Sequence, residues 1–169
     1  MSADETPPTT QFSDADVETM ARAVYGLYHL ISDRSADKAA SGAEAVWASA
    51  SDLERDSCRA QVRDIPRKLA RVHRRIVRSA GGMLASDVAP FSAEEVELLA
   101  RDEHERWMAH ERESGSAGAG GSGPTAHPCM VPFDQLSDED QEKDRAAVRN
   151  IPQLLALTGM DLDREHAGS

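Results

Sequence analysis

Four residues in the second half of the chain have side chains that could bind a metal ion or act in catalysis: His104, His110, His127 and Cys129. His104 and His110 are six residues apart, whereas paired ligands on one helix face are usually four apart. His127 and Cys129 have no second ligand pair at zinc spacing. The chain also lacks a Gly-x-Ser-x-Gly motif, and GAGGSGP lacks the Lys and Ser/Thr of a phosphate-binding P-loop. We therefore expect no metal, no cofactor and no catalytic residue.

Aromatic and arginine side chains are better candidates, for binding rather than catalysis. The chain has only two Trp, two Tyr and three Phe residues, yet Tyr28 and Trp107 occupy matching positions of an internal repeat. Arg59 and Arg145 are a second matched pair, and the planar guanidinium group suits phosphate oxygens. Two alternatives are open: the aromatics fill the core, and the arginines form ion pairs with the acidic first helix of each repeat.

The internal repeat is read directly from the sequence. Residues 12–28 align with residues 91–107 at an offset of 79, and residues 51–70 align with residues 137–156 at an offset of 86. Identical pairs include Phe12/Phe91, Ser13/Ser92, Glu18/Glu97, Arg22/Arg101, Ser51/Ser137, Arg63/Arg149, Pro66/Pro152 and Leu69/Leu155. We interpret the chain as two copies of one helix–loop–helix unit, the second with seven more residues in its loop.

Capping serines, prolines and glycines predict where the helices lie. We expect helices over 13–32, 51–81, 92–113 and 137–159, with Pro66 and Pro152 bending or splitting the second and fourth. Val17, Met20, Val24, Leu53, Leu69 and Ile76 are among the candidate core residues. We expect loops over 33–50 and over 114–123, which contains five glycines, and some strand near 127–133.

The predicted fold is all-α, a single domain over 12–162. A lone helical hairpin buries too little apolar surface, so repeat 1 (12–82) and repeat 2 (91–162) should close a shared core about a pseudo-twofold axis. Residues 1–11 are expected to be a flexible lead and 163–169 a frayed tail.

Composition excludes several classes of protein. The net charge of −11 argues against nonspecific nucleic-acid binding, which depends on neutralising phosphates. No apolar run is long enough to span a membrane, and the N-terminus does not resemble a secretory signal. Cys58 and Cys129 suit thiols in a reducing compartment, so we expect a cytoplasmic protein.

The charge is unevenly distributed along the chain. Residues 63–78 hold seven Arg and Lys residues against one Asp. This segment could bind an anionic ligand or an acidic partner. Alternatively, it packs on the acidic segment 94–105 of the same or a second molecule, which leaves a homodimer open.

The second half of the chain resembles the ryanodine-receptor repeat. The resemblance rests on LARDEHERW, then HP-x-x-VPF-x-x-L, then EKDR-x-x-V-x-x-IP-x-LLA-x-x-G. The family includes paired repeats in calcium-release channels and short bacterial and phage proteins. It implies a compact, mostly helical domain with quasi-twofold symmetry and a cleft between repeats that accepts an adenine nucleotide. Here SGSAGAGGSG replaces the family's aromatic segment, and the first repeat lacks the His-Pro and Val-Pro motifs.

The resemblance implies a set of site residues. Trp107 is the Trp of the family's His-Glu-x-Trp motif, so Tyr28 and Trp107 are expected to sandwich a base. Arg145 and Arg59 would meet its phosphates, and His104 and His127, which lie in matching motifs, are further candidates. The function implied is a non-catalytic module that senses or sequesters a small nucleotide or ADP-ribose-like signal, in stress or phage defence. The alternative is a protein-interaction or assembly module without a small-molecule ligand.

Overall fold

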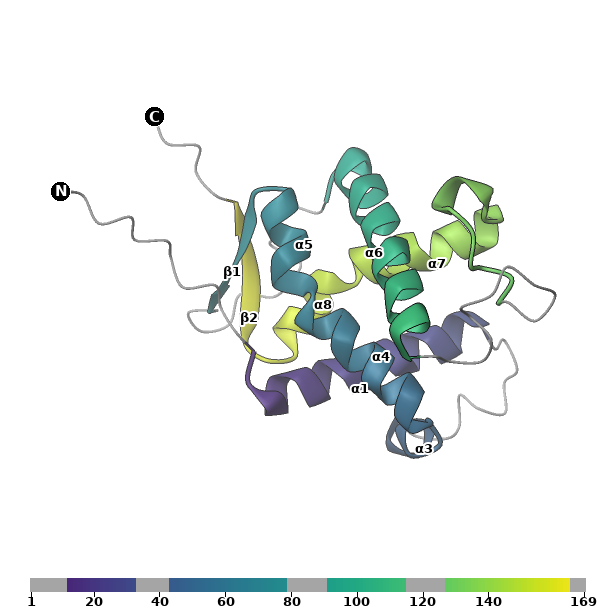
Figure 1. Ribbon diagram of the computed structural model, residues 1–169. Helices are drawn as coiled ribbons and strands as arrows, with labels where there is room; N and C mark the ends of the chain where they lie inside the picture. The colour runs from purple at the N-terminus through teal and green to yellow at the C-terminus, as the bar shows by residue number, and fades with distance from the viewer. Residues whose placement is uncertain (1–11, 33–42, 79–90, 115–126, 165–169) are drawn as a thin grey trace.

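The computed structural model describes residues 12–32, 43–78, 91–114 and 127–164. The expectations for the N-terminal lead and the glycine-rich segment lie outside the described residues. Of the expected frayed tail 163–169, Asp163 and Arg164 lie instead in a β-strand, and the last five residues are outside the described residues. Within them the chain is mostly helical, as predicted, with one two-stranded sheet (Figure 1). The elements are α1 (Asp14–Ser32), α3 (Ala43–Ala48), α4 (Asp52–Arg63), α5 (Ile65–Arg71), β1 (Arg74–Arg78), α6 (Ala93–Ser114), η3 (Phe133–Gln135), α7 (Asp138–Arg149), α8 (Ile151–Ala156) and β2 (Met160–Arg164). No helix in this part of the chain has the length and apolar character needed to cross a membrane.

The predicted helix starts are confirmed by serine caps. Each capping serine accepts a hydrogen bond from the backbone N–H three residues later, which satisfies one of the unpaired donors of the first turn. The four bonds are 3.1 Å at Ser13, 3.3 Å at Ser51, 3.1 Å at Ser92 and 3.1 Å at Ser137. Ser51 and Glu54 complete a reciprocal capping box.

Pro66 and Pro152 split their helices, as predicted. Proline has no N–H to donate, so it is tolerated in the first turn of a helix and not in the interior. The chain accordingly bends at Asp64 between α4 and α5 and at Asn150 between α7 and α8.

The prediction that the second helix continues to residue 81 is wrong. α5 ends at Arg71, His73 takes a left-handed conformation (φ 53°), and β1 follows. Gly159 (φ 70°) is also left-handed and lies directly before β2, as His73 lies just before β1. The two strands pair antiparallel, with Ile76 opposite Leu162. The sequence of β1, RRIVR, does not alternate between polar and apolar residues, and its partner strand lies far along the chain, so no local pattern indicated a strand.

Two further expectations are corrected. No strand forms near 127–133; the chain there makes a turn and then η3. The expected loop at 33–50 contains α3, whose Trp47 is buried against α1. Leu53, expected in the core, is 52% exposed because it lies in the first turn of α4 at the protein surface.

The core has two parts, and the half-buried Phe91 packs against both. α1 packs on α4 and α6 packs on α7. Val17, Met20 and Val24 of α1 are buried with Leu69 and Leu155 in the larger cluster, as expected for all but Leu155. A smaller cluster gathers residues of α6, η3 and α7, namely Val96, Leu99, Ala100, Phe133 and Val148.

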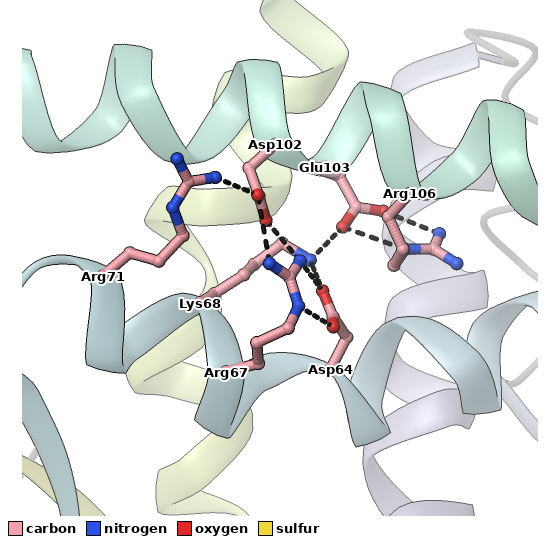
Figure 2. Close-up of polar contacts among 7 residues, drawn as sticks. All are labelled: Asp64, Arg67, Lys68, Arg71, Asp102, Glu103 and Arg106. Carbon is pink, nitrogen blue, oxygen red and sulfur yellow. Dashed lines mark hydrogen bonds and ion pairs between the residues drawn. The ribbon is translucent and has the colours of Figure 1, made fainter.

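A buried network of charges joins α4 and α5 to α6 (Figure 2). Lys68 Nζ lies 2.6 Å from Asp64 and 2.5 Å from Glu103, and the Lys68 and Glu103 side chains are only 3% and 2% exposed. Asp102 accepts hydrogen bonds from Arg67 and Arg71. The basic segment therefore packs on the acidic helix of the same molecule, which is one of the two alternatives open from the sequence.

Replacing Lys68 with Met should lower the free energy of unfolding by about 3 kcal/mol or more. The loss arises because Asp64 and Glu103 would keep buried charges without their shared cation. Chemical denaturation measures it. The matched control is Arg75→Met, which removes an exposed pair with Asp163 and should cost less than about 1 kcal/mol. Equal losses in the two variants would show that the buried Lys68 contributes no more to the free energy of unfolding than an exposed ion pair does.

Candidate functional site

A cleft of about 590 Å³ lies where α1, α4 and α6 meet. Its walls come from both halves of the chain. The lining residues are Tyr25, Tyr28, His29, Ser51, Leu53, Glu54, Ser57, Cys58, Gln61, Arg106, Trp107, His110, Glu111, Ser114 and His127.

The structure brings Tyr28 and Trp107 to this one cleft. Both side chains are partly buried, so each combines a packed edge with surface that faces the cavity. Burial, followed by the nearby carboxylates of Glu103 and Asp144, raises the pKa of Tyr28 well above its ordinary value, so its phenol stays neutral. Two aromatic rings at one cavity form a surface for a flat ligand.

His127 also lines the cleft and supports Trp107. The two rings meet edge to face with their centroids 5.2 Å apart. His127 Nδ1 accepts a hydrogen bond of 3.2 Å from the backbone N–H of Cys129, which fixes the ring orientation. His127 therefore lies where the sequence predicted a ligand-binding residue.

His104 lies beneath the cleft rather than on its surface. Its side chain is 3% exposed and its ring stacks on Trp107 at 5.7 Å. Nε2 lies 2.7 Å from the Val131 carbonyl, which can only accept, so this nitrogen carries the proton. Nδ1 faces Asp144 Oδ2 at 3.4 Å. His104 thus positions Trp107 from below.

Asp144 is a buried carboxyl suited to this neighbour. Burial, and then the Glu103 carboxylate, raise the pKa of Asp144 from 3.8 to about 7. A protonated Asp144 can donate toward His104 Nδ1, which lies 3.4 Å away. The sequence offered no sign of this pair, because Asp144 stands among surface-like charges in EKDR.

Arg59 and Arg145 are not brought to the cleft. Arg59 Nε binds Glu18 Oε2 at 2.9 Å, and Arg145 Nε binds Glu97 Oε2 at 2.8 Å. Their guanidinium groups lie over the Trp47 and Phe133 rings respectively. Both arginines therefore form the ion pairs that the sequence left open as their alternative role.

Arg106 is the cation that the structure places in the cleft wall, and the sequence reasoning passed over it. Nη2 and Nε bind Glu103 Oε1 at 2.7 and 3.1 Å (Figure 2). Nη1 is shielded from solvent and has no hydrogen-bond partner among the described residues. Arg106 occupies the variable position of the His-Glu-x-Trp motif. Its place next to Trp107 was therefore the one sign in the sequence that it could line the same cleft.

The remaining nucleophilic and metal-binding side chains do not form a reactive site among the described residues. Cys58 lines the cleft, but burial raises its pKa to about 12, so it is a neutral thiol at neutral pH. Within the described segments, no three His, Cys, Asp or Glu side chains gather as metal ligands would.

The raised pKa of Asp144 predicts a specific pH dependence of stability. Between about pH 4 and 7 the folded protein holds this proton while the unfolded chain has lost it. Stability should therefore fall as pH rises through that window, by up to about 1.4 kcal/mol per unit. Asp144→Asn removes the effect, so it should gain stability relative to wild type at pH 8 but much less at pH 5, as measured by urea unfolding.

The matched control for this prediction is Asp134→Asn. Arg101 lowers the pKa of exposed Asp134, so its difference from wild type should be the same at pH 5 and pH 8. An Asp144→Asn difference that is equally independent of pH would contradict the raised pKa.

Comparison with known proteins identifies the half of the chain that carries Trp107 and Arg106. None of the curated proteins matches the chain. Residues 87–164 match the RyR domain, which spans α6, η3, α7, α8 and β2 and agrees with the resemblance seen in the sequence. The second half of the chain, residues 87–164, therefore belongs to the RyR domain family.

Proposed function

We propose that this protein is a non-catalytic module that binds a small nucleotide or ADP-ribose-like molecule in the cleft. The observation that carries the proposal is the convergence of Tyr28 and Trp107, 79 positions apart, on one cavity. A base would lie against their rings, and the edge-to-face contact with His127 would hold the Trp107 ring in place.

The dimensions and lining of the cleft support a small-molecule ligand. Small-molecule sites usually enclose roughly 300–1,000 Å³ and combine apolar walls with a few polar groups. The cleft of about 590 Å³ offers aromatic walls together with Gln61, Ser57 and Arg106 as polar contacts.

We further propose that residues 12–82 and 91–162 are two copies of one unit related by a pseudo-twofold axis. The ion pairs Glu18–Arg59 and Glu97–Arg145 join equivalent residues of the two copies. In the sheet, Ile76 pairs with Leu162, its equivalent at the offset of 86. An axis through this pair would relate β1 to β2 and place the cleft between the copies.

The alternative of an assembly module has less support. It relied on the basic segment 63–78 to attract an acidic partner. Arg67, Lys68 and Arg71 are instead engaged by Asp64, Asp102 and Glu103 of the same molecule. A role in sensing or sequestering a signal suits the cleft better.

Replacing Trp107 with Ala should weaken ligand binding about 5- to 150-fold, because stacking on an aromatic ring contributes roughly 1–3 kcal/mol per base. Adenine nucleotides, ADP-ribose and their guanine and cytosine counterparts would be compared by thermal unfolding. A ligand at 100 times its Kd should add about 2.7 kcal/mol to the stability of the wild type. Titration calorimetry then gives Kd for the variant.

The matched control is Trp47→Phe, which alters the other tryptophan of the chain, outside the cleft. This variant should bind as tightly as wild type, and its single remaining tryptophan, Trp107, should report binding through fluorescence. Unchanged affinity in Trp107→Ala would rule out the proposed pocket. Failure of every compound to stabilise the wild type would favour assembly, which light scattering would reveal as a dimer.

A further inference from the structure

Gln61 lies between the cleft and the core. It is near the end of α4, one helical turn after Ser57 and Cys58, which line the same cleft. Gln61 is 8% exposed, and it also borders two smaller hollows inside the fold. Tyr28 lines the cleft and one of these hollows together with Gln61, so the two residues are neighbours at the inner end of the cleft.

The amide of Gln61 has no hydrogen-bond partner among the described residues. The other buried polar side chains in this part of the chain each have a hydrogen bond or an ion pair: Lys68, Arg74, Asp102, Glu103, His104, Asp144 and Asp161. Buried polar groups are normally paired, because an unpaired one costs free energy. Gln61 is therefore an exception that calls for an explanation.

The Gln61 amide is still accessible from the cleft. In the described segments, the unpaired side-chain atoms that are completely shielded from solvent are all arginine nitrogens. Neither the oxygen nor the nitrogen of the Gln61 amide is among them, so both keep some accessible surface. Because Gln61 lines the cleft, a ligand there could supply the missing hydrogen bonds.

A carboxamide matches a particular kind of base edge. It has an N–H donor beside a carbonyl acceptor, and it forms two hydrogen bonds with an edge that carries the complementary pair. Adenine has an amino donor with a ring-nitrogen acceptor on each side, so either side of the amino group fits. Guanine has a complementary pair on only one side of its carbonyl oxygen, and its own amino group needs a further partner.

We infer that Gln61 determines base specificity in the cleft, and that its amide binds an amino group next to a ring nitrogen, as in adenine. The inference rests on the proposed function, since it concerns the same cleft. It assigns recognition of the base edge to the first half of the chain, opposite Trp107. At the offset of 86 the equivalent of Gln61 is Ala147, whose side chain cannot form hydrogen bonds, so the second half has no matching amide there.

Analogues of AMP that lack one group each test the inference on the full chain. AMP, purine riboside monophosphate (no amino group), 1-deaza-AMP and 7-deaza-AMP (one ring nitrogen fewer each) would be titrated by calorimetry, with GMP and CMP alongside. The purine riboside compound should bind about 5- to 10-fold more weakly than AMP, because it loses one hydrogen bond. One of the two deaza compounds should lose a similar factor, and AMP should bind more tightly than GMP and CMP.

Variants then assign this preference to one side chain. Gln61→Met keeps a similar volume but cannot form the two hydrogen bonds. It should bind AMP about 5- to 150-fold more weakly, which corresponds to the roughly 1–3 kcal/mol of a bidentate amide–base pair. It should also bind AMP and the purine riboside compound equally well. The matched control is Gln153→Met, an exposed glutamine of α8 that does not line the cleft and should leave all affinities unchanged.

The stability of the variant provides a check on its folding. Because the Gln61 amide has no partner to lose, Gln61→Met should unfold at a urea concentration no lower than that of the wild type. A weaker affinity in this variant would then reflect the contact with the base and not a disrupted cleft.

The outcomes separate the inference from the proposed function. A Gln61→Met protein that still prefers AMP to the purine riboside compound would overturn the assignment to Gln61. Tighter binding of GMP or CMP than of AMP would overturn the preference for adenine. Both results would leave the nucleotide cleft standing. Absence of binding by every compound would remove the proposed function, and the inference with it.

Discussion

The buried ion pair between Lys68 and Glu103 is the constraint on which the rest of the structure depends. Two charges with side chains only 3% and 2% exposed are costly to bury unless they are held in close contact. Their 2.5 Å contact therefore permits little sliding or rotation of α6 against α5. Because Trp107 lies one helical turn after Glu103, the same contact sets the direction in which Trp107 points.

A second buried pair lies beneath the aromatic wall. His104 stacks on Trp107 and is held from both sides by Val131 and Asp144. The Asp144 carboxyl and the Tyr28 phenol both lie near Glu103, and the pKa of each is raised by burial and by that carboxylate. Buried polar groups thus lie directly beneath Trp107 and act electrostatically on Tyr28 as well.

The two halves of the chain use the same local contacts but differ at the cleft. Glu18–Arg59 joins α1 to α4, and Glu97–Arg145 joins α6 to α7. The cleft, in contrast, has Tyr28 on one side and Trp107, with Arg106 and His127, on the other. The shared contacts stabilise the fold, and the differences make the two sides of the cleft chemically distinct.

The features that the sequence determined by itself depend on interactions between residues close together in the chain. Capping serines and the two prolines act within one turn of the chain, so the starts of four helices and the breaks at Pro66 and Pro152 could be predicted from spacing alone. The scarcity of aromatics and the internal repeat likewise singled out Tyr28 and Trp107.

Only the tertiary structure decided which partner each charge and each strand would find. Arg59 and Arg145 could have faced phosphates or carboxylates, and β1 could have continued as helix, because both outcomes depend on residues far away in the chain. Arg106 had no distinguishing mark in the sequence; its ion pair with Glu103 and its place in the cleft wall follow from the packing of α6.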